Sequence, residues 1–391
     1  MSLHFLKTED IKIINQKFWQ NPKIKKEKIM TKRQRYLKAL RNEKIDELVW
    51  APNFDYWLRV NVAEGTLPEK YRTMSRNDIV RAIGGYIWNR QTGIRTIYDS
   101  SVKIESWKIE DGSIREIKTP VGTVRCMYKK TEGEHRSQHL SEHFIKTVDD
   151  IRIMKYIAEA TYFEPDNEST IKALEETGED GIVLNGCFPV PFIEFAKIDA
   201  GYVNAFYLWF DYRKEVDELV NTYFKKYIEA VKILASGYAD VVATSDNMDG
   251  IMITPEIFKQ YAIPYYQECK KILSEKGKIF EGHWCGRTEN LLPLVPGCGL
   301  DVVEAIVTAP MAKITLKEAL DILDNKVVLQ GGIPSVLVCH EGGTKDDFIR
   351  YINEVILPLK GRRSFILGMS DNVPPNADFE RVEIVSKLIY Q

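Results

Sequence analysis

The sequence predicts an α/β fold built around a parallel β-sheet. From about residue 148 onward, short apolar runs alternate with segments that have helical periodicity. The runs are almost continuously apolar, which is typical of strands buried on both faces, as in parallel sheets. These strand candidates lie at residues 181–186, 239–247, 278–286, 300–306, 327–333 and 363–371. The helical segments between them include residues 217–236 and 255–277.

The part of the chain before residue 100 adds one helix and one strand. Residues 31–40 have apolar residues at helical spacing after Thr31, which is a candidate N-cap. Residues 47–52 then form a buried strand that Pro52 ends. This count of seven strands leaves two architectures open, because a (β/α)8 barrel needs eight and a doubly wound sheet needs fewer. An eighth strand would have to lie in residues 187–238 or in an insertion.

Such an insertion is predicted for residues 102–130, where apolar and polar residues alternate with a period of two. Asp111-Gly112 is a strong hairpin turn signal, and Pro120 and Gly122 mark a second turn. We therefore expect two or three antiparallel strands. These strands should lie at the rim of the main fold. In the sequence they are inserted between its first strand and the rest of it.

The remaining composition describes an ordinary globular chain. Residues 31–391 are expected to form one domain, preceded by a Lys-rich charged extension at residues 1–30. The formal net charge is −2, so no global field favours nucleic acid or an anionic membrane. No apolar run approaches the ~20 residues that span a bilayer. The six cysteines are scattered, and no secretory leader is recognisable, so we expect a reduced, cytoplasmic protein.

Polar residues gather where the predicted strands end. Ligands bind at the carboxyl ends of strands in both parallel architectures, so these residues are candidates for a shared site. The alternative is that Asn and Asp cap the helices that follow the strands. The catalytic candidates are Asp246 and Glu304, and the substrate-binding candidates are Asn53, Asp55, Asn185 and Asn247.

His283 and Cys285 form the most specific pair among the strand ends. On a strand, alternate side chains point to the same face, so imidazole and thiol can be offered to one ion with Trp284 on the other side. Zinc accepts such mixed ligands, and a catalytic zinc has three of them and one open position. The alternative is a buried Cys beside a hydrogen-bonded His.

A third ligand would have to come from another strand. Cys187 and Asp371 both end strands and are possible, and Glu281 has the same parity as His283 but lies deeper. Cys298 lies in a turn before a strand, at the opposite end of the sheet, so we expect it to be structural.

The chain resembles the uroporphyrinogen decarboxylase superfamily, which includes the zinc-dependent methylcobamide:coenzyme M methyltransferases. The matching segments occur in the expected order at residues 32–52, 117–125, 143–157, 245–265, 282–306 and 365–382. The resemblance implies a (β/α)8 TIM barrel, here with an N-terminal helical extension and a β-hairpin insertion. True uroporphyrinogen decarboxylases carry an N-terminal Arg-Gln-Ala-Gly-Arg motif, whereas the matching stretch here reads "WAPNFDYWLRV".

The methyltransferase branch is similar in its His-x-Cys motif, which His283 and Cys285 match. That branch has a distant Cys after the last strand, and Asp371 occupies this position here. The resemblance therefore implies zinc held by these three residues, and a corrinoid carried by a partner protein. A protein of this branch would move a methyl group between cobalamin and a small molecule. Two other readings are a cofactor-free decarboxylase and a non-catalytic binding subunit. Tyr56, Trp57, Phe188 and Phe192, which follow strand ends, are candidates for a partner-docking patch or for core packing.

Overall fold

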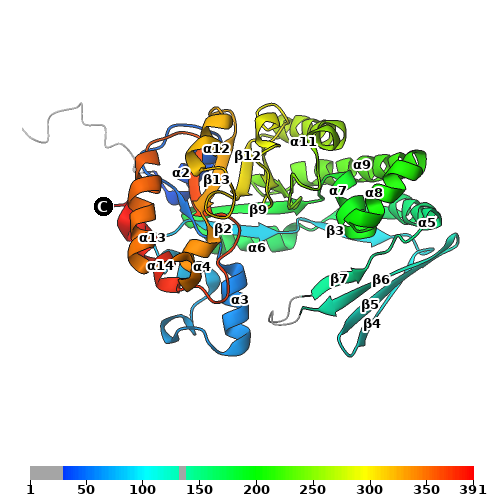
Figure 1. The fold of residues 1–391 in the computed structure, drawn as a ribbon, viewed down its shortest axis with the longest axis horizontal. Helices are drawn as coiled ribbons and strands as arrows, with labels where there is room; N and C mark the ends of the chain where they lie inside the picture. Colours follow the sequence, from blue (N-terminus) through cyan, green and yellow to red (C-terminus); the bar gives the residue numbers. More distant parts are fainter. Residues whose placement is uncertain (1–29, 132–137) are drawn as a thin grey trace, which may run out of the picture. The chain divides into compact units, whose positions relative to one another are not determined.

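Eight parallel strands form a barrel in the computed structural model, which describes residues 30–131 and 138–391 (Figure 1). The hydrogen-bonded order is β1-β14-β13-β12-β11-β10-β9-β2, and every neighbouring pair is parallel. The Tyr86 N–H donates to the Trp50 carbonyl at 2.7 Å, which joins the start of β2 to β1 and nearly closes the barrel. The barrel strands are β1 Trp50–Ala51, β2 Ile87–Gln91, β9 Gly181–Cys187, β10 Val241–Thr244, β11 Ile279–His283, β12 Val302–Ile306, β13 Val328–Ile333 and β14 Phe365–Met369.

This arrangement confirms the predicted (β/α)8 fold and places all seven predicted strands. The eighth strand is β2, which lies outside the two regions where we expected it. Its sequence is Ile-Trp-Asn-Arg-Gln, and only its first two residues are buried. A strand whose second half is polar lacks the continuous apolar run that marks the others. Its polar end runs beside Asn185 at the carboxyl end of β9.

The amino end of the barrel is closed by helix α2, Lys32–Leu40. Tyr36, Ala39 and Leu40 from this helix are buried in the same core cluster as the inward-facing side chains of the strands. The Tyr36 hydroxyl donates to Oε1 of Gln330 on β13 at 2.9 Å. This polar contact lies inside the barrel and fixes the helix against the strands. The predicted N-terminal helix is thus the plug of the barrel.

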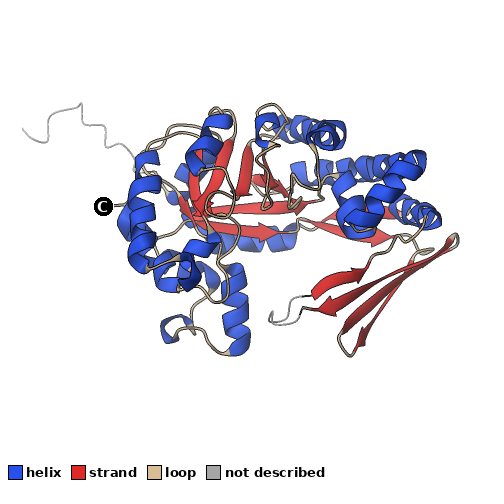
Figure 2. Ribbon diagram, viewed as in Figure 1, coloured by secondary structure: helices blue, strands red, loops and turns tan. Residues whose placement is uncertain are grey.

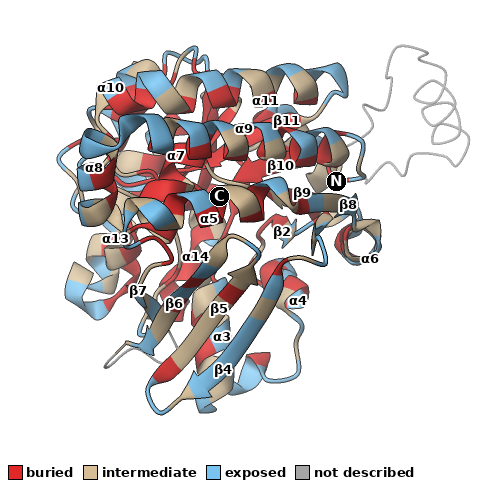
Figure 3. Cartoon of the chain, turned by 90° about the vertical axis from the view of Figure 1, so that its right-hand side faces the viewer, coloured by how far each residue is buried: buried red, intermediate tan, exposed pale blue. Residues whose placement is uncertain are grey.

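Helices alternate with the strands and cover the outside of the barrel (Figure 2). Figure 3 shows that α9 and α11 turn their buried faces toward the strands and expose the opposite faces. This amphipathic pattern is what a helix needs to cover a parallel sheet. The α-helices after α2 are α3 Asp55–Glu64, α4 Arg76–Ala82, α5 Val148–Glu159, α6 Asn167–Thr177, α7 Pro191–Ile193, α8 Tyr202–Asp211, α9 Arg213–Ala235, α10 Pro255–Ile257, α11 Ile263–Glu275, α12 Leu316–Ile322, α13 Lys345–Tyr351 and α14 Phe379–Ile389.

In the part of the chain that the structure describes, three helical connections contain π-helical segments. The segments are η3 Glu194–Asp199, η4 Phe258–Ala262 and η8 Ile352–Ile356. Such segments shift the register of side chains along a helix and are frequent at functional sites. The short 3₁₀ turns are η1 Glu69–Tyr71, η2 Gly178–Asp180, η5 Leu292–Leu294, η6 Ser335–Val338, η7 His340–Gly342 and η9 Leu357–Leu359.

The predicted antiparallel insertion is present as β4 Lys103–Ile109, β5 Gly112–Thr119 and β6 Gly122–Lys130, and a fourth strand, β7 Gln138–Glu142, completes the sheet. It follows β2, so it comes after the second barrel strand and not after the first as we expected. A separate ribbon, β3 Ile94–Tyr98 with β8 Thr161–Pro165, leads into and out of it. Ile117 and Val124, on the inner face of this sheet, are buried and belong to the main hydrophobic core.

Two further expectations concern the charged N-terminal extension and segments that could cross a membrane. The charged extension predicted at residues 1–30 falls almost entirely outside the described residues. Within residues 30–131 and 138–391, no helix is both long enough and apolar enough to cross a bilayer.

Candidate functional site

His283 and Cys285 come together at the carboxyl end of β11. His283 is the last residue of the strand and is buried, and Cys285 follows two residues later with partial exposure. Trp284 lies on the opposite side, fully buried, and makes an edge-to-face contact with Phe258 at 5.4 Å between ring centroids. The expected alternation of side chains is therefore present, and imidazole and thiol share the inner face of the barrel mouth.

Asp371 brings a carboxylate to the same place from the loop after β14. One ligand atom from each of His283, Cys285 and Asp371 lies within 4.8 Å of the other two. The distance from His283 Nε2 to Asp371 Oδ1 is 3.8 Å. The third residue that the resemblance implied is therefore adjacent to the first two.

The backbone around these ligand atoms is strained. Asp371 has a φ of 120° and Asn247, which accepts a 3.4 Å hydrogen bond from the Cys285 thiol, has a φ of 45°. Asn tolerates the left-handed region, whereas an aspartate at 120° occupies a conformation that favours glycine. Strain of this kind costs of order 1–3 kcal/mol and is concentrated at functional sites. The side chains of both residues are thereby directed toward Cys285 and His283.

Glu304 fixes the orientation of the His283 ring. Its carboxylate, on the neighbouring strand β12, accepts a hydrogen bond from His283 Nδ1. Burial alone would lower the pKa of the imidazolium, but the Glu304 charge and the Cys285 side chain raise the pKa of His283 well above its ordinary value. With Nδ1 occupied, Nε2 is the nitrogen that faces Asp371.

A second carboxyl lies one layer deeper in the barrel. Glu281 is fully buried, and neither of its oxygens has a hydrogen-bond partner among the residues that the structure describes. Burial and then the nearby Glu304 charge raise the pKa of Glu281 to about 8. A carboxyl in this environment holds its proton at neutral pH, so the charge at the mouth comes from the groups above it.

Two cations near the site were missed by the sequence reasoning. Arg90, at the end of β2, lies close enough for its charge to lower the pKa of both Glu281 and Asp371 against the larger effect of burial. Lys197, on η3, is partly buried, and burial lowers its pKa while the charges of Cys285 and Asp246 oppose this. Arg90 was hidden because its strand was not recognised. Lys197 lies within a helix, where no strand-end rule applies.

The other predicted residues have different surroundings. Asp246 is fully buried and accepts hydrogen bonds from the Val190 N–H at 2.8 Å, from the Tyr266 hydroxyl at 2.7 Å and from Thr244. Three donors from three segments make it a structural tie beside the mouth. Because the Asp246 side chain is fully buried, its carboxylate is not accessible to a substrate at the mouth, which argues against the predicted catalytic role.

The predicted substrate-binding residues are dispersed. Asn185 points outward and donates to the Thr170 hydroxyl of α6 at 2.9 Å, so it is not at the mouth. Asp55 is exposed at the start of α3 and pairs with Arg76 at 2.8 Å. The Asn53 carbonyl accepts a hydrogen bond from the Val373 N–H at 2.9 Å, close to the Asp371 loop. Of the four candidates, Asn247 forms a hydrogen bond with a member of the cluster, Cys285.

Three further predictions concern core residues. Cys298 is fully buried before β12, at the amino end of the barrel as expected. Cys187 is also buried, and burial raises the pKa of its thiol well above the ordinary value, so it is a poor ligand. Trp57 stacks on Phe379 at 3.8 Å and Phe192 stacks on Tyr261 at 4.4 Å, both fully packed in the core. Trp57 and Phe192 are therefore core residues, whereas the other two candidates for a docking patch, Tyr56 and Phe188, are half-buried.

The chain belongs to the uroporphyrinogen decarboxylase (URO-D) family, whose profile matches residues 139–391. A methyltransferase from Methanosarcina mazei has a similar structure, with a TM-score of 0.56 and 14% sequence identity over 92% of this chain and 98% of that one. At this identity the likeness shows the fold alone. No match is found among curated proteins.

Proposed function

We propose that this protein is a zinc-dependent methyltransferase that works with a corrinoid protein. One observation carries the proposal: His283, Cys285 and Asp371 converge within 4.8 Å at the barrel mouth, where members of this fold bind their substrates. The methyl group would move between cobalamin on the partner and a small molecule at this cluster. The fold of the Methanosarcina mazei methyltransferase is consistent with this reaction.

The chemistry of the three donors fits zinc. One imidazole nitrogen, one thiolate and one carboxylate oxygen give three protein ligands and leave a fourth position for a small molecule. A thiolate ligand disfavours magnesium and calcium, which bind oxygen donors. Metal-binding histidines usually donate their second ring N–H to a carboxylate or carbonyl, and Glu304 accepts from Nδ1 of His283 in this way. The contact points Nε2 toward the metal position and makes that nitrogen more basic.

The side chains around the cluster would prepare the small molecule for reaction. Bound zinc would act as a Lewis acid that lowers the pKa of a thiol or polarises an oxygen. Lys197 and Arg90 would attract an anionic group of the same molecule to the mouth. In the metal-free protein the Cys285 thiol donates to Asn247 Oδ1 at 3.4 Å, and once zinc binds the thiolate the Asn247 amide would have to present its N–H to the sulfur instead. The protein would therefore supply position and electrostatics for chemistry that belongs to the corrinoid.

The test combines metal analysis with a methyl-transfer assay. Wild-type protein and the control Cys298→Ser should purify with close to one zinc per chain, whereas His283→Ala should lack it. With methylcobalamin and a small thiol, the cobalt–carbon bond breaks as the sulfur–methyl bond forms, the thiol proton is released and cobalt keeps the electron pair. The loss of methylcobalamin absorbance should require His283 and Cys285. Wild-type protein with no zinc and no methyl transfer would refute the proposal.

The same experiment distinguishes a methyltransferase from the two alternative functions, a decarboxylase and a binding subunit. A cofactor-free decarboxylase of this family should consume uroporphyrinogen with or without His283, and a binding subunit should do neither reaction. The absence of the Arg-Gln-Ala-Gly-Arg motif from "WAPNFDYWLRV" speaks against porphyrinogen as the substrate.

A further inference from the structure

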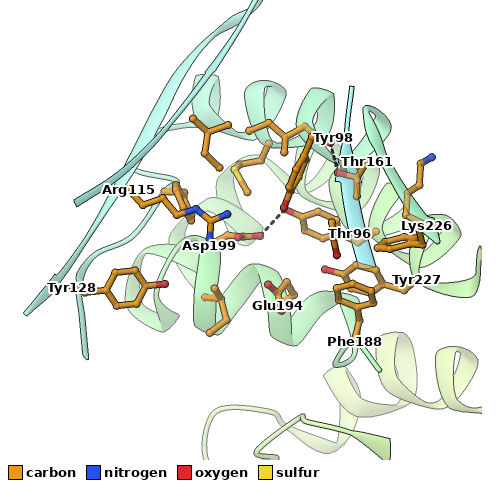
Figure 4. A pocket seen from close by; sticks show the side chains of 18 residues that line it. Thr96, Tyr98, Arg115, Tyr128, Thr161, Phe188, Glu194, Asp199, Lys226 and Tyr227 are labelled. Carbon is orange, nitrogen blue, oxygen red and sulfur yellow. Dashed lines mark hydrogen bonds between the residues drawn. The ribbon is translucent and has the colours of Figure 1, made fainter. Parts of the chain in front are cut away.

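A cavity lies between the barrel and the inserted sheet, and its lining includes none of His283, Cys285 and Asp371 (Figure 4). Its volume is about 220 Å³, and its walls come from the β3–β8 ribbon, the inserted sheet, α5, η3 and α9. Liquid water occupies about 30 Å³ per molecule, so the cavity has room for a small organic molecule and far more than a bare ion needs.

Aromatic rings form much of the cavity wall. Phe188 stacks on Tyr227 at 4.2 Å, and Tyr227 stacks on Tyr223 at 5.6 Å, which makes a continuous wall. Tyr98 and Tyr128 line the cavity from the ribbon and from the inserted sheet. Aromatic walls of this kind are the usual surroundings of alkylated ammonium groups, which they attract through cation–π and apolar contacts.

Two carboxyl groups enter this cavity from η3. Asp199 is buried and accepts a 2.7 Å hydrogen bond from the Tyr223 hydroxyl. Glu194 lines the cavity, and no hydrogen bond or ion pair to its carboxyl is present within residues 30–131 and 138–391. Glu194 is half-buried, and a carboxylate that is partly removed from water without a partner is destabilised. The pair therefore either keeps a proton or takes up a cation.

The nearby cations do not neutralise the pair. Lys226 reaches the cavity, but its ammonium is 3.4 Å from Glu229 and lies over the Tyr162 ring. Arg115 enters from β5, and within the described residues neither Arg115 nor Lys226 forms an ion pair with Glu194 or Asp199. Lys197, on η3 itself, attracts the Glu194 charge but forms no ion pair with it within the described residues.

We propose that this cavity binds a small organic cation of the alkylated ammonium class, held by Glu194 and Asp199 within the aromatic wall. An anion would meet two carboxylates, and an uncharged apolar molecule would leave them unpaired. A metal ion would fill little of the 220 Å³. The site uses no residue of the His283 cluster, so the proposal is independent of the methyltransferase proposal.

The pKa values of the acidic pair give the site a pH dependence. Burial raises the pKa of Glu194 to about 7, and burial together with the Glu194 charge raises the pKa of Asp199 well above its ordinary value. A cation binds the ionised pair, so its affinity should rise as the pH increases through about 7 and fall below it. The other titratable or charged groups around the pair are Lys197, Tyr223, Tyr227, Lys226, Arg115, Tyr98 and Tyr128.

The test is calorimetric titration of the full chain with choline, whose charge is fixed, and with its uncharged isostere 3,3-dimethylbutan-1-ol. Choline should bind with more than roughly tenfold higher affinity at pH 8 than the isostere does. Glu194→Gln keeps the side-chain shape and should weaken choline binding by roughly tenfold. Glu168→Gln, which removes the same charge from an exposed position on α6, should leave binding unchanged.

Two further measurements keep the proposal falsifiable if Glu194→Gln folds poorly. His283→Ala should bind choline as wild type does, because the cavity is separate from the metal cluster. A crystal structure with choline should place its ammonium beside Glu194 and Asp199. The proposal is overturned if choline fails to bind, if the isostere binds equally well, or if choline is found elsewhere on the protein.

Discussion

The Glu304 carboxylate accepts a hydrogen bond from Nδ1 of His283, across the boundary between two neighbouring barrel strands. This contact decides which nitrogen of the ring is free, because Nε2 is left facing Asp371 at 3.8 Å. It also decides the charge of the ring in the metal-free protein, because it raises the pKa of His283 against the effect of burial.

Glu304→Gln should weaken zinc binding by roughly 10–100-fold, the usual effect of removing such a partner. The amide keeps the shape of the side chain but supplies no charge to hold the imidazole N–H. Competition between the protein and a chromophoric chelator measures the affinity. Glu43→Gln, at an exposed position, should match wild type. Equal affinity of Glu304→Gln and wild type would mean that Glu304 has no part in metal binding.

Zinc affinity should fall as the pH is lowered, and each bound zinc should release protons. The pKa of His283 is raised well above its ordinary value, so the imidazolium must lose a proton before Nε2 can bind. In Glu304→Gln the main cause of the raised pKa is absent, so the fall should move to lower pH. Affinities measured across a pH series in both proteins test this. A pH profile that does not move would show that another group controls the titration.

Cys285→Ser and Cys298→Ser should differ in metal content although each removes one thiol. Cys285 lies within 4.8 Å of the other two ligand atoms, whereas Cys298 is packed in the core at the other end of the barrel. We expect Cys285→Ser to lose most bound zinc and Cys298→Ser to keep it, with a modest loss of thermal stability in the latter. Loss of metal from Cys298→Ser alone would refute the assigned ends of the strands.

The strands that the sequence predicted are those with buried, continuous apolar runs. The strand it missed, β2, ends in Asn89, Arg90 and Gln91. Arg90 has the parity of Trp88 and faces the barrel interior, whereas Asn89 and Gln91 lie on the outer side, where Gln91 Nε2 donates to Asn89 Oδ1 at 2.9 Å. This run of polar residues concealed the strand. The same cause concealed Arg90, whose charge acts on Asp371. A polar strand end in a barrel is itself a signal, but only once the eighth strand is being sought.

Candidate site residues could be predicted from the sequence wherever the alternation of side chains along a strand decides which residues face the barrel interior. On β11, parity correctly paired His283 with Cys285. On β9, Ile182 and Leu184 face the barrel interior, so the same rule would have placed Asn185 on the outer side, where it contacts Thr170. Asp371 lies beyond its strand, and its place followed from the family resemblance together with closure of the barrel. Lys197 follows from neither argument because a π-helical segment carries it.

Glu281→Gln should stabilise the metal-free protein, and more so at higher pH. The pKa of Glu281 is about 8 in the folded state, well above its ordinary value, so its ionisation opposes folding. This penalty is absent at low pH and grows as the pH rises from about 5 toward about 8, because the unfolded chain ionises first. Thermal unfolding of both proteins at several pH values measures the effect. A difference that is constant with pH, or no larger than that of the exposed Glu275→Gln, would refute the assignment.

Asp371→Gly and Asp371→Ala should have equal effects on metal and different effects on stability. Both remove the carboxylate, so both should weaken zinc binding while His283 and Cys285 still hold some of it. The φ of 120° at this position suits glycine and strains alanine, so Asp371→Gly should be more stable by about 1 kcal/mol. Denaturant unfolding of the two metal-free variants measures this difference. If alanine is as stable as glycine, the backbone at Asp371 is not strained, and the carboxylate owes its position to its hydrogen bond with Asn372 at 2.9 Å.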